Sequence, residues 1–231
     1  MKAMILAAGL GKRLRPLTLK IPKALIEINQ KALILYHLEK LEAIGVKEVI
    51  INLHYHGDMI KRFLRDGAFS DIQIVYSEES EVLETGGGIK KALPFFRDDP
   101  FICVNADVYT DFDFRVLKLG SNSNSLGKLI LVENPAHNPA GDFSLDSEGK
   151  LLPPNSSGLG NLTFSGISVL SPELFDGFPN SKFPLADVFL KAIPMGLLSG
   201  LKYDGPWYDV GSPERLNKLQ KEFGDLLGSK N

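Results

Sequence analysis

The sequence predicts an α/β fold: a Rossmann-like, mostly parallel sheet flanked by helices, with a small inserted β subdomain. Short apolar runs alternate with helical periodicity up to about residue 126, which is typical of parallel strands joined by covering helices. Beyond that point β runs follow one another more closely, which indicates the subdomain. The length of 231 residues, 44% of them hydrophobic, suits a single domain over 1–231, because such a chain can bury a core without disulfides.

The first half contains four candidate strands and three candidate helices. The strands are apolar runs bounded by Gly, Asp or Pro, at 2–7, 47–53, 72–76 and 100–106. The helices lie between them, near 32–44, 57–66 and 87–93. Apolar residues recur at helical spacing in the first of these helices, at Leu33, Tyr36, Leu38, Leu41 and Ile44. Gly45 follows where a left-handed cap is expected, so that helix ends there.

The second half is richer in β runs and in proline. We expect a strand at 128–133, a hairpin over 141–152 with Glu148-Gly149 near its turn, and a strand at 162–170. Four prolines then punctuate short helices: Pro172, Pro179, Pro184 and Pro194. Ser212 and Pro213 are typical of a helix start and open a closing helix.

Composition excludes several classes of protein. The 26 Lys and Arg against 28 Asp and Glu give a formal net charge of -2, whereas duplex DNA or an anionic membrane demands a surplus of cations. We therefore expect neither nucleic acid nor a membrane as a partner. The single cysteine, Cys103, excludes a disulfide framework and a Cys-based zinc site, and makes the reducing cytoplasm the expected compartment.

The near-neutral total conceals a basic N-terminal segment. Residues 1–26 contain no acidic side chain and six cationic ones: Lys2, Lys12, Arg13, Arg15, Lys20 and Lys23. Most of them follow the first strand, and ligands of doubly wound sheets bind where loops leave the carboxyl ends of strands. Gly9 and Gly11 let the backbone approach a ligand and offer N–H groups to phosphate oxygens. The segment predicts a polyphosphate site; the simpler alternative is a tight turn with solvated cations.

Two common phosphate loops do not fit this segment. A Walker A loop needs Ser or Thr after Gly-Lys and a Gly five residues before the Lys, but Arg13 and Ala7 occupy those positions. The dinucleotide-binding fingerprint needs a third Gly, and that position is Leu14.

The segment from Leu6 to Lys23 instead resembles the signature of the sugar-1-phosphate nucleotidylyltransferases. That pattern is Gly-x-Gly-x-Arg, then Pro and Thr, then Pro-Lys, and it is matched by Gly9, Gly11, Arg13, Pro16, Thr18, Pro22 and Lys23. The resemblance covers nearly the whole chain. It implies a nucleotidyltransferase fold with a nucleotide-binding half at about 1–110 and a sugar-binding half at about 111–231.

The resemblance also implies a nucleotide site and a set of catalytic residues. The expected nucleotide-binding residues are Ala8, Gly9, Gly11, Lys12, Arg13, Lys23, Thr85 and Gly86. The expected catalytic residues are Arg13, Lys23, Asp107 and Asp209. Arg13 and Lys23 would neutralise the phosphates of a nucleoside triphosphate wrapped by the loop.

Asp107 follows the apolar run Phe101 to Val104 in the order Asn105-Ala106-Asp107. A carboxylate facing a basic phosphate loop would repel a bare phosphate unless a cation lay between them, and Mg²⁺ takes carboxylate and phosphate oxygens together. From the residues alone Asp107 could equally cap the following turn. The family carries a metal-binding Asp at this place, so the resemblance implies Mg²⁺ on Asp107.

Asp209 lies in a second matching segment, Trp207-Tyr208-Asp209-Val210-Gly211-Ser212-Pro213-Glu214. It resembles the family's late Trp-x-Asp-x-Gly-Thr/Ser-Pro-Glu pattern, in which the Asp would be the second Mg²⁺ ligand. The alternative is a plain helix start capped by Ser212, and both can hold together.

Glu84-Thr85-Gly86-Gly87-Gly88 opens a candidate helix. Three consecutive glycines cost helix stability, which suggests a base or sugar packing against bare backbone. Family members often have Gly-Thr-Ala-Gly here, so Glu84 departs from the pattern. Together with Asn105-Ala106-Asp107-Val108 and the segment 163–167, this stretch most resembles the branch that activates N-acetylmuramate 1-phosphate with UTP.

The sugar site departs from many relatives, which carry Glu-x-Lys-Pro after the central hairpin. Here the aligned stretch is Leu151-Leu152-Pro153-Pro154, without acid or base. We expect substrate contacts from Asn105, the backbone at Gly141 and the segment 163–165 instead.

The resemblance implies Mg²⁺-dependent transfer of UMP from UTP to a sugar 1-phosphate, of which N-acetylmuramate 1-phosphate in cell-wall sugar recycling is the first candidate. The expected partners are these small molecules, and the protein is expected to be a cytoplasmic monomer or small homo-oligomer. Another sugar-1-phosphate uridylyl-, thymidylyl- or guanylyltransferase is the alternative within the family. A non-catalytic nucleotide-sugar sensor of the same fold is the alternative outside the enzymes.

Overall fold

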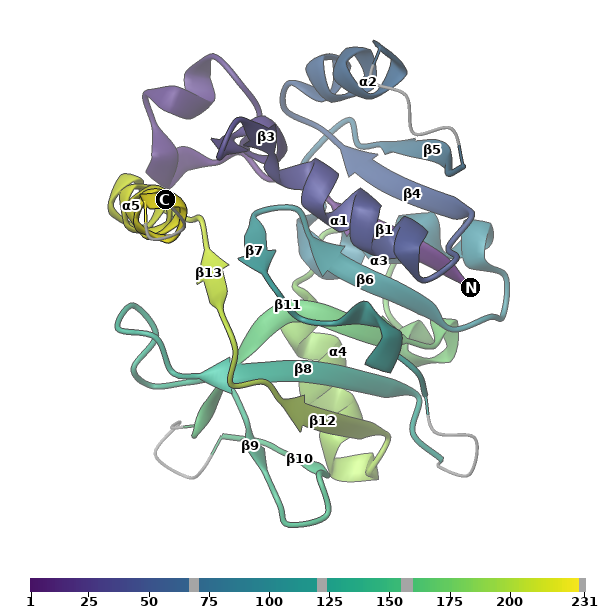
Figure 1. Ribbon diagram of the computed structural model, residues 1–231. Helices are drawn as coiled ribbons and strands as arrows, with labels where there is room; N and C mark the ends of the chain where they lie inside the picture. The colour runs from purple at the N-terminus through teal and green to yellow at the C-terminus, as the bar shows by residue number, and fades with distance from the viewer. Residues whose placement is uncertain (67–70, 120–123, 155–159, 229–231) are drawn as a thin grey trace.

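A seven-stranded sheet organises the computed structural model, which describes residues 1–66, 71–119, 124–154 and 160–228 (Figure 1). Its strands lie in the order β12-β8-β11-β6-β1-β4-β5, and all run in one direction except β11. Their bounds are β1 Lys2–Leu6, β4 Glu48–Leu53, β5 Gln73–Glu78, β6 Phe101–Asn105, β8 Gly127–Glu133, β11 Leu162–Leu170 and β12 Leu198–Lys202. The expected mostly parallel sheet is confirmed.

Helices cover both faces of the sheet because successive side chains of a strand point to opposite faces, and in these strands the side chains on both faces are apolar. Ala3 and Ile5 of β1 pack with α1 (Leu33–Ala43) and α2 (Gly57–Asp66), whereas Met4 packs with α3 (Glu84–Phe96) and α4 (Leu185–Ala192). Gly45 after α1 has a φ of +81°, as the left-handed cap required. The described residues also form six short 3-10 helices, at Lys12–Leu14, Leu17–Leu19, Lys23–Leu25, Phe114–Val116, Pro172–Phe175 and Ile193–Met195.

The expected β subdomain is smaller than the sequence indicates. The hairpin forms as β9 (Ser144–Leu145) and β10 (Leu151–Leu152), a separate two-stranded sheet, with Gly149 at a φ of +76° in its turn. Strands β8 and β11 instead extend the main sheet, and β12, which was not anticipated, forms its edge. Helix α3 begins three residues earlier than predicted, at Glu84.

A third apolar cluster ties the C-terminal helix α5 (Pro213–Gly228) to the N-terminal loop. It joins Leu216 and Leu219 of α5 to Leu14 of the loop and to residues of the β2–β3 hairpin (Glu27–Ile28 and Lys31–Ala32). Strand β13 (Trp207–Asp209) leads into α5 and pairs antiparallel with β7 (Val108–Thr110), as Figure 1 shows. The two ends of the domain therefore meet around the loop that follows β1.

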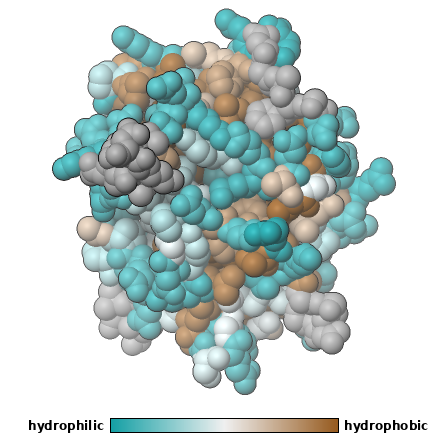
Figure 2. Space-filling view, in the orientation of Figure 1, coloured by the Kyte–Doolittle hydropathy of each residue, from teal (hydrophilic) through white to brown (hydrophobic). Residues whose placement is uncertain are grey.

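Hydrophilic side chains cover much of the face seen in Figure 2, with smaller apolar areas among them. Across the parts of the chain that the structure describes, no helix is long and apolar enough to span a bilayer.

Candidate functional site

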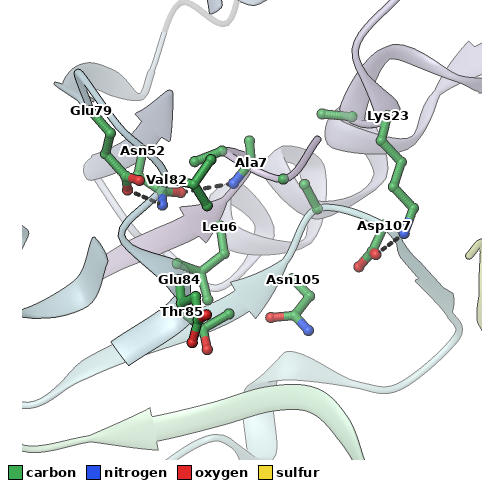
Figure 3. Close-up of a pocket in the computed structure, with 14 residues that line it drawn as sticks. Leu6, Ala7, Lys23, Asn52, Glu79, Val82, Glu84, Thr85, Asn105 and Asp107 are labelled. Atoms are coloured by element: carbon green, nitrogen blue, oxygen red, sulfur yellow. Dashed lines mark hydrogen bonds and ion pairs between the residues drawn. The ribbon is translucent and has the colours of Figure 1, made fainter. Parts of the chain in front are cut away.

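A pocket opens where the carboxyl ends of β1 and β6 meet, beside the loop after β1 (Figure 3). The first strand, its loop and the end of β6 form one side, and the start of α3 forms the other. Its lining residues are Leu6, Ala7, Ala8, Gly9, Lys23, Ala24, Asn52, Glu79, Val82, Glu84, Thr85, Asn105, Ala106 and Asp107. The pocket thus brings together Ala8, Gly9, Lys23, Thr85, Asn105 and Asp107 from among the residues predicted for the site.

A buried polar network fixes the back of this pocket. Asn52, at the end of β4, accepts a hydrogen bond from the Ala7 N–H at 2.8 Å and donates one to Glu79 Oε1 at 2.7 Å (Figure 3). Glu79 Oε2 in turn accepts from the Leu83 N–H at 3.1 Å, just before α3. Both side chains are almost fully buried, at 2% and 5% exposure, and each is satisfied by these bonds. The network therefore holds the loop after β1 and the start of α3 at a set separation.

Lys23 and Asp107 form an ion pair at the mouth of the pocket, drawn as a dashed line in Figure 3. Lys23 lies at the end of the basic loop after β1, and Asp107 lies just after β6. The two side chains can meet because β1 and β6 are parallel neighbours in the sheet. The Val210 N–H donates to the Asp107 carbonyl at 2.9 Å, and β13 places Asp209 directly opposite Val108. The pairing of β7 with β13 thus brings Asp209 next to Asp107 from about a hundred residues away.

Two nitrogen-bearing side chains, Arg215 and His137, lie against Asp209. Arg215 Nη1 donates to Asp209 Oδ2 at 2.8 Å, and His137 Nε2 lies 3.5 Å from the same oxygen. Burial lowers the pKa of His137, and the guanidiniums of Arg215 and Arg13 lower it further against the opposite effect of Asp209. The His137 ring is stacked near Trp207, whose Nε1 donates to the Ser165 carbonyl at 2.9 Å.

The two glycines of the basic loop have different roles: Gly9 faces the pocket, and Gly11 allows the loop to pack on itself. Gly9 lines the pocket, and no atom lies within 4 Å of where its Cβ would be, so a ligand can approach that backbone. Gly11 has a φ of +60°, and its missing Cβ would overlap Thr18, whose hydroxyl donates to the Gly11 carbonyl at 2.8 Å. Lys12 and Arg13 are exposed on the 3-10 turn after Gly11, outside the pocket wall.

The three glycines at the start of α3 do not make room for a ligand, so that interpretation is wrong. All three are buried, and a Cβ on Gly86 would overlap the Phe183 ring. A Cβ on Gly87 would overlap the Ser181 carbonyl oxygen, and one on Gly88 would lie 2.7 Å from Glu79 Oε1. The glycines let the 181–183 segment and the Asn52–Glu79 network approach the helix backbone. Gly86 itself stays a predicted nucleotide-binding residue.

A second pocket adjoins the first and shares Thr85 and Asn105 with it. Apolar side chains dominate it, and its lining residues are Thr85, Asn105, Gly141, Asp142, Phe143, Pro154, Phe164, Pro184, Leu185, Ala186, Phe189 and Leu190. Asn105 and Gly141, both predicted to contact the substrate, lie here together. Thr163 and Ser165 are buried and face away from it: the Thr163 hydroxyl donates to Asn134 Oδ1 at 3.0 Å.

Sequence analysis missed four polar residues of the site: Asn52, Glu79, His137 and Arg215. Asn52 and Glu79 carried a usable signal, because each polar residue comes at the carboxyl end of a strand, where ligands of this sheet type bind. Arg215 directly follows the second family-like segment, six residues after Asp209. Nothing in the sequence near His137 indicated its place.

Asp107 and Asp209 form a donor set that fits Mg²⁺. Mg²⁺ is commonly held by one or two carboxylates together with phosphate oxygens. Asp209 Oδ1 is buried without a hydrogen-bond partner among residues the structure places, so the chain leaves this carboxylate only partly satisfied. Within the described ranges no cluster of three or more His, Cys, Asp or Glu is placed to hold a metal ion.

Comparisons with known proteins identify the family of the chain. Residues 2–225 match the family model for nucleotidyl transferases. N-acetylmuramate alpha-1-phosphate uridylyltransferase of Neisseria meningitidis serogroup B is 44% identical over 97% of this chain and 99% of its own length. The enzyme of the same name from Caulobacter vibrioides is 32% identical over 92% of each chain.

A solved structure shares the fold. A putative glucose-1-phosphate thymidylyltransferase from Bacillus anthracis, solved in complex with a sucrose, superposes with a TM-score of 0.85 over 96% of this chain and 94% of its own, at 18% identity. The chain therefore belongs to the nucleotidyl transferase family of enzymes, and it is most like that family's sugar-1-phosphate members.

Proposed function

We propose that this protein transfers UMP from UTP to N-acetylmuramate 1-phosphate, with release of pyrophosphate. The observation that carries the proposal is the pair of adjoining pockets, joined at Thr85 and Asn105, with Lys23 and Asp107 on the wall of the first. The first pocket offers open backbone at Gly9 for a nucleotide, and the second offers an apolar chamber for a sugar. The similarity to two enzymes of that name supports the choice of both substrates.

The chemistry needs positioning and charge neutralisation more than proton transfer. A phosphate oxygen of the sugar 1-phosphate attacks the α-phosphorus of UTP in line, and the bond to pyrophosphate breaks. The nucleophile is already ionised, so no general base is required, and catalysis rests on orientation and preorganised charge. Lys23 and Arg13 hold the departing pyrophosphate, and the loop from Ala8 to Lys12 encloses the triphosphate.

Asp107 and Asp209 would hold Mg²⁺, which supplies a Lewis acid for the phosphate oxygens. The chain's own contribution is to bring these two carboxylates together through β7 and β13. Their negative charge also opposes nucleotide binding when no metal is present, so the proposed activity depends on a divalent cation.

The second pocket favours an acylated, ether-bearing sugar over a plain hexose. Of its lining residues in the described chain only Asp142 is charged, and both of its oxygens are engaged, one by the Phe164 N–H at 2.8 Å and one by Asn138 Nδ2 at 3.0 Å. Aromatic and aliphatic side chains form the remaining wall, including Phe143, Phe164 and Phe189. Methyl groups of an N-acetyl or lactyl substituent bury well against such a wall, whereas bare hydroxyls would lose water without new partners.

The same assignment gives the protein its place in the cell. A UDP-linked N-acetylmuramate is a precursor of cell-wall polymer, so we assign the protein to the cytoplasmic recycling of cell-wall sugars. Cys103 is a free, buried thiol, which suits a reducing compartment.

The test is a pyrophosphate-release assay with Mg²⁺, UTP, ATP, GTP or TTP, and N-acetylmuramate 1-phosphate. Turnover with UTP well above the other three nucleotides is expected, and chelation of the metal should abolish it. Turnover that prefers GTP or TTP would contradict the choice of base. No turnover with any nucleotide, alongside tight binding of a nucleotide sugar, would show a sensor instead of an enzyme.

A further inference from the structure

Arg215 occupies the Asp209 carboxylate in a way that the chemistry proposed above does not require. Its Nη1 donates to Asp209 Oδ2 at 2.8 Å, and its side chain is only 17% exposed. A charged pair that is this shielded from solvent holds more strongly than one on an open surface. Asp209 therefore already has a full counter-charge from the chain.

The start of α5 holds Arg215 in this position. The Arg215 N–H lies 3.4 Å from the Ser212 hydroxyl, and the next residue, Leu216, is buried in the cluster that joins α5 to the basic loop. Gly211 completes the arrangement, since a Cβ there would lie 2.7 Å from Arg215 Cζ and 2.8 Å from Asp209 Oδ1. The absence of a side chain at position 211 is what lets the guanidinium lie across the backbone.

The oxygen that Arg215 occupies is the one a metal could reach. Asp209 Oδ1 is buried beside Gly211, whereas the Asp209 side chain as a whole is 23% exposed. Because Oδ1 is buried, we take Oδ2 as the metal-binding oxygen of Asp209, and Oδ2 faces both Arg215 and His137. Asp107 is in a similar state, because Lys23 holds its Oδ2. A divalent cation that binds Asp209 through Oδ2 has to displace Arg215 from that oxygen.

We propose that Arg215 is a resident counter-ion of Asp209, which a divalent cation displaces when it binds. The inference rests on the metal role assigned to Asp209 in the proposed function. Arg215 acts through Asp209 and is thus a positioning residue. By competing for Oδ2 it keeps the metal affinity of the free protein low, so that the metal binds firmly only when a triphosphate adds its own oxygens.

The test measures Mn²⁺ binding to the nucleotide-free protein, by electron paramagnetic resonance titration at pH 7.5. The Arg215→Met variant keeps the length of the side chain and removes its charge, and it should bind Mn²⁺ about tenfold more tightly than the unaltered protein. Its Tm without metal should fall, because Asp209 loses its partner, and the rise in Tm on adding Mn²⁺ should be larger than in the unaltered protein. Lys218→Met, which removes an exposed charge from the same helix, should change neither quantity.

Two results would contradict the role of Arg215 as a counter-ion. Equal or weaker Mn²⁺ binding in Arg215→Met would overturn the counter-ion role, and a lower Tm with an unchanged Mn²⁺ shift would reduce Arg215 to a structural residue. Should Arg215→Met fail to fold, Arg215→Gln removes the charge while keeping a donor for Oδ2, and the same affinity gain is expected. Asp209→Asn separates the two proposals: if it leaves Mn²⁺ affinity unchanged, the metal site of the proposed function fails as well.

Discussion

At the scale of single residues, the site depends on charges that the fold brings together from distant parts of the chain. Lys23 lies 84 residues from Asp107, and their ion pair exists because β1 and β6 are neighbours in the sheet. In the proposed reaction both residues act on charge that develops in the transition state, and binding of UTP draws on many other contacts.

We therefore predict that Asp107→Asn and Lys23→Met lower kcat by about 10²–10³, and change the dissociation constant of UTP much less. Steady-state kinetics together with equilibrium nucleotide binding measure the two effects separately. Asp99→Asn, an exposed carboxylate before the other end of β6, should leave both unchanged. Near-normal turnover in Asp107→Asn would refute its assignment.

A second residue-scale prediction concerns the buried Asn52–Glu79 network. Glu79 accepts two hydrogen bonds, so Glu79→Gln leaves an NH₂ group facing either Asn52 Nδ2 or the Leu83 N–H. The free energy of unfolding should fall by about 1–3 kcal/mol, because one buried donor loses its acceptor. Urea denaturation checks this, with Glu81→Gln as an exposed control that should have almost no effect. Equal stability of the two variants would show that the hydrogen bonds of Glu79 do not stabilise the folded protein.

At the scale of elements, long apolar runs were predictable and short or glycine-rich pieces were not. Strands β1, β4 and β6 are buried on both faces and consist of nearly continuous apolar residues, so local sequence was enough to place them. The edge strand β5 is only partly buried, but its short apolar run Ile74-Val75-Tyr76 also marked it. Strands β7 and β13 have three residues each and exist because they pair with one another across the site. Their sequences carry no comparable local signal, and that pairing is what sets Asp209 beside Asp107.

Helix α3 shows how the same feature can be seen in sequence and wrongly explained. The three glycines were noticed because they cost helix stability, but the sequence could not say whether a ligand or the chain itself filled the space. Phe183, Ser181 and Glu79 fill it. Those contacts depend on the tertiary fold.

Because the chain fills this space, we predict that Gly87→Ala lowers the stability of the protein, which is the opposite of the usual effect of this substitution in a helix. Alanine in a helix interior normally adds up to about 1 kcal/mol of stability over glycine. Here the new methyl group would overlap the Ser181 carbonyl oxygen, which belongs to backbone and cannot swing away. We expect the free energy of unfolding to fall by about 1–3 kcal/mol, as in an overpacked core. A stabilised variant in urea denaturation would show that the 181–183 segment does not press on α3.

At the scale of the whole molecule, the core beneath the site contains a titratable group. His37 of α1 is 1% exposed, and neither ring nitrogen has a hydrogen-bond partner in the described structure. Burial lowers its pKa from 6.5 to about 4; the Val108 backbone and the Asp107 carboxylate act in the opposite direction, and Lys40 lowers the pKa further. The folded protein therefore keeps His37 neutral over a range in which the unfolded chain binds a proton.

The sign of the resulting pH dependence follows from linkage. Because the folded pKa is the lower one, the stability contributed by neutral His37 is complete above about pH 6.5 and is lost as the pH falls toward 4. Between pH 7.5 and pH 5 the loss should be about 2 kcal/mol, and His37→Leu should lose less over the same interval. Urea denaturation of both proteins at the two pH values measures the difference. If the unaltered protein and His37→Leu lost the same free energy of unfolding between the two pH values, folding would not lower the pKa of His37.

The whole-molecule arrangement also separates what sequence could say of the function from what it could not. Motifs in the loop after β1 and around Asp107 and Asp209 indicated the enzyme family, because each motif is local. The wall of the second pocket, proposed to bind the sugar, is assembled from the segments around Phe143, Phe164 and Leu185, which lie far apart in the chain. Its apolar character becomes visible only when the sheet, the hairpin and α4 are brought together.

A competition between sugar phosphates shows whether this wall selects the proposed substrate. Equal concentrations of N-acetylmuramate 1-phosphate, N-acetylglucosamine 1-phosphate and glucose 1-phosphate compete for the protein with UTP and Mg²⁺, and mass spectrometry quantifies the UDP-sugars formed at early times. The account predicts that UDP-N-acetylmuramate is the dominant product and UDP-glucose the least abundant. A mixture dominated by UDP-glucose, or one with no UDP-sugar at all, would contradict it.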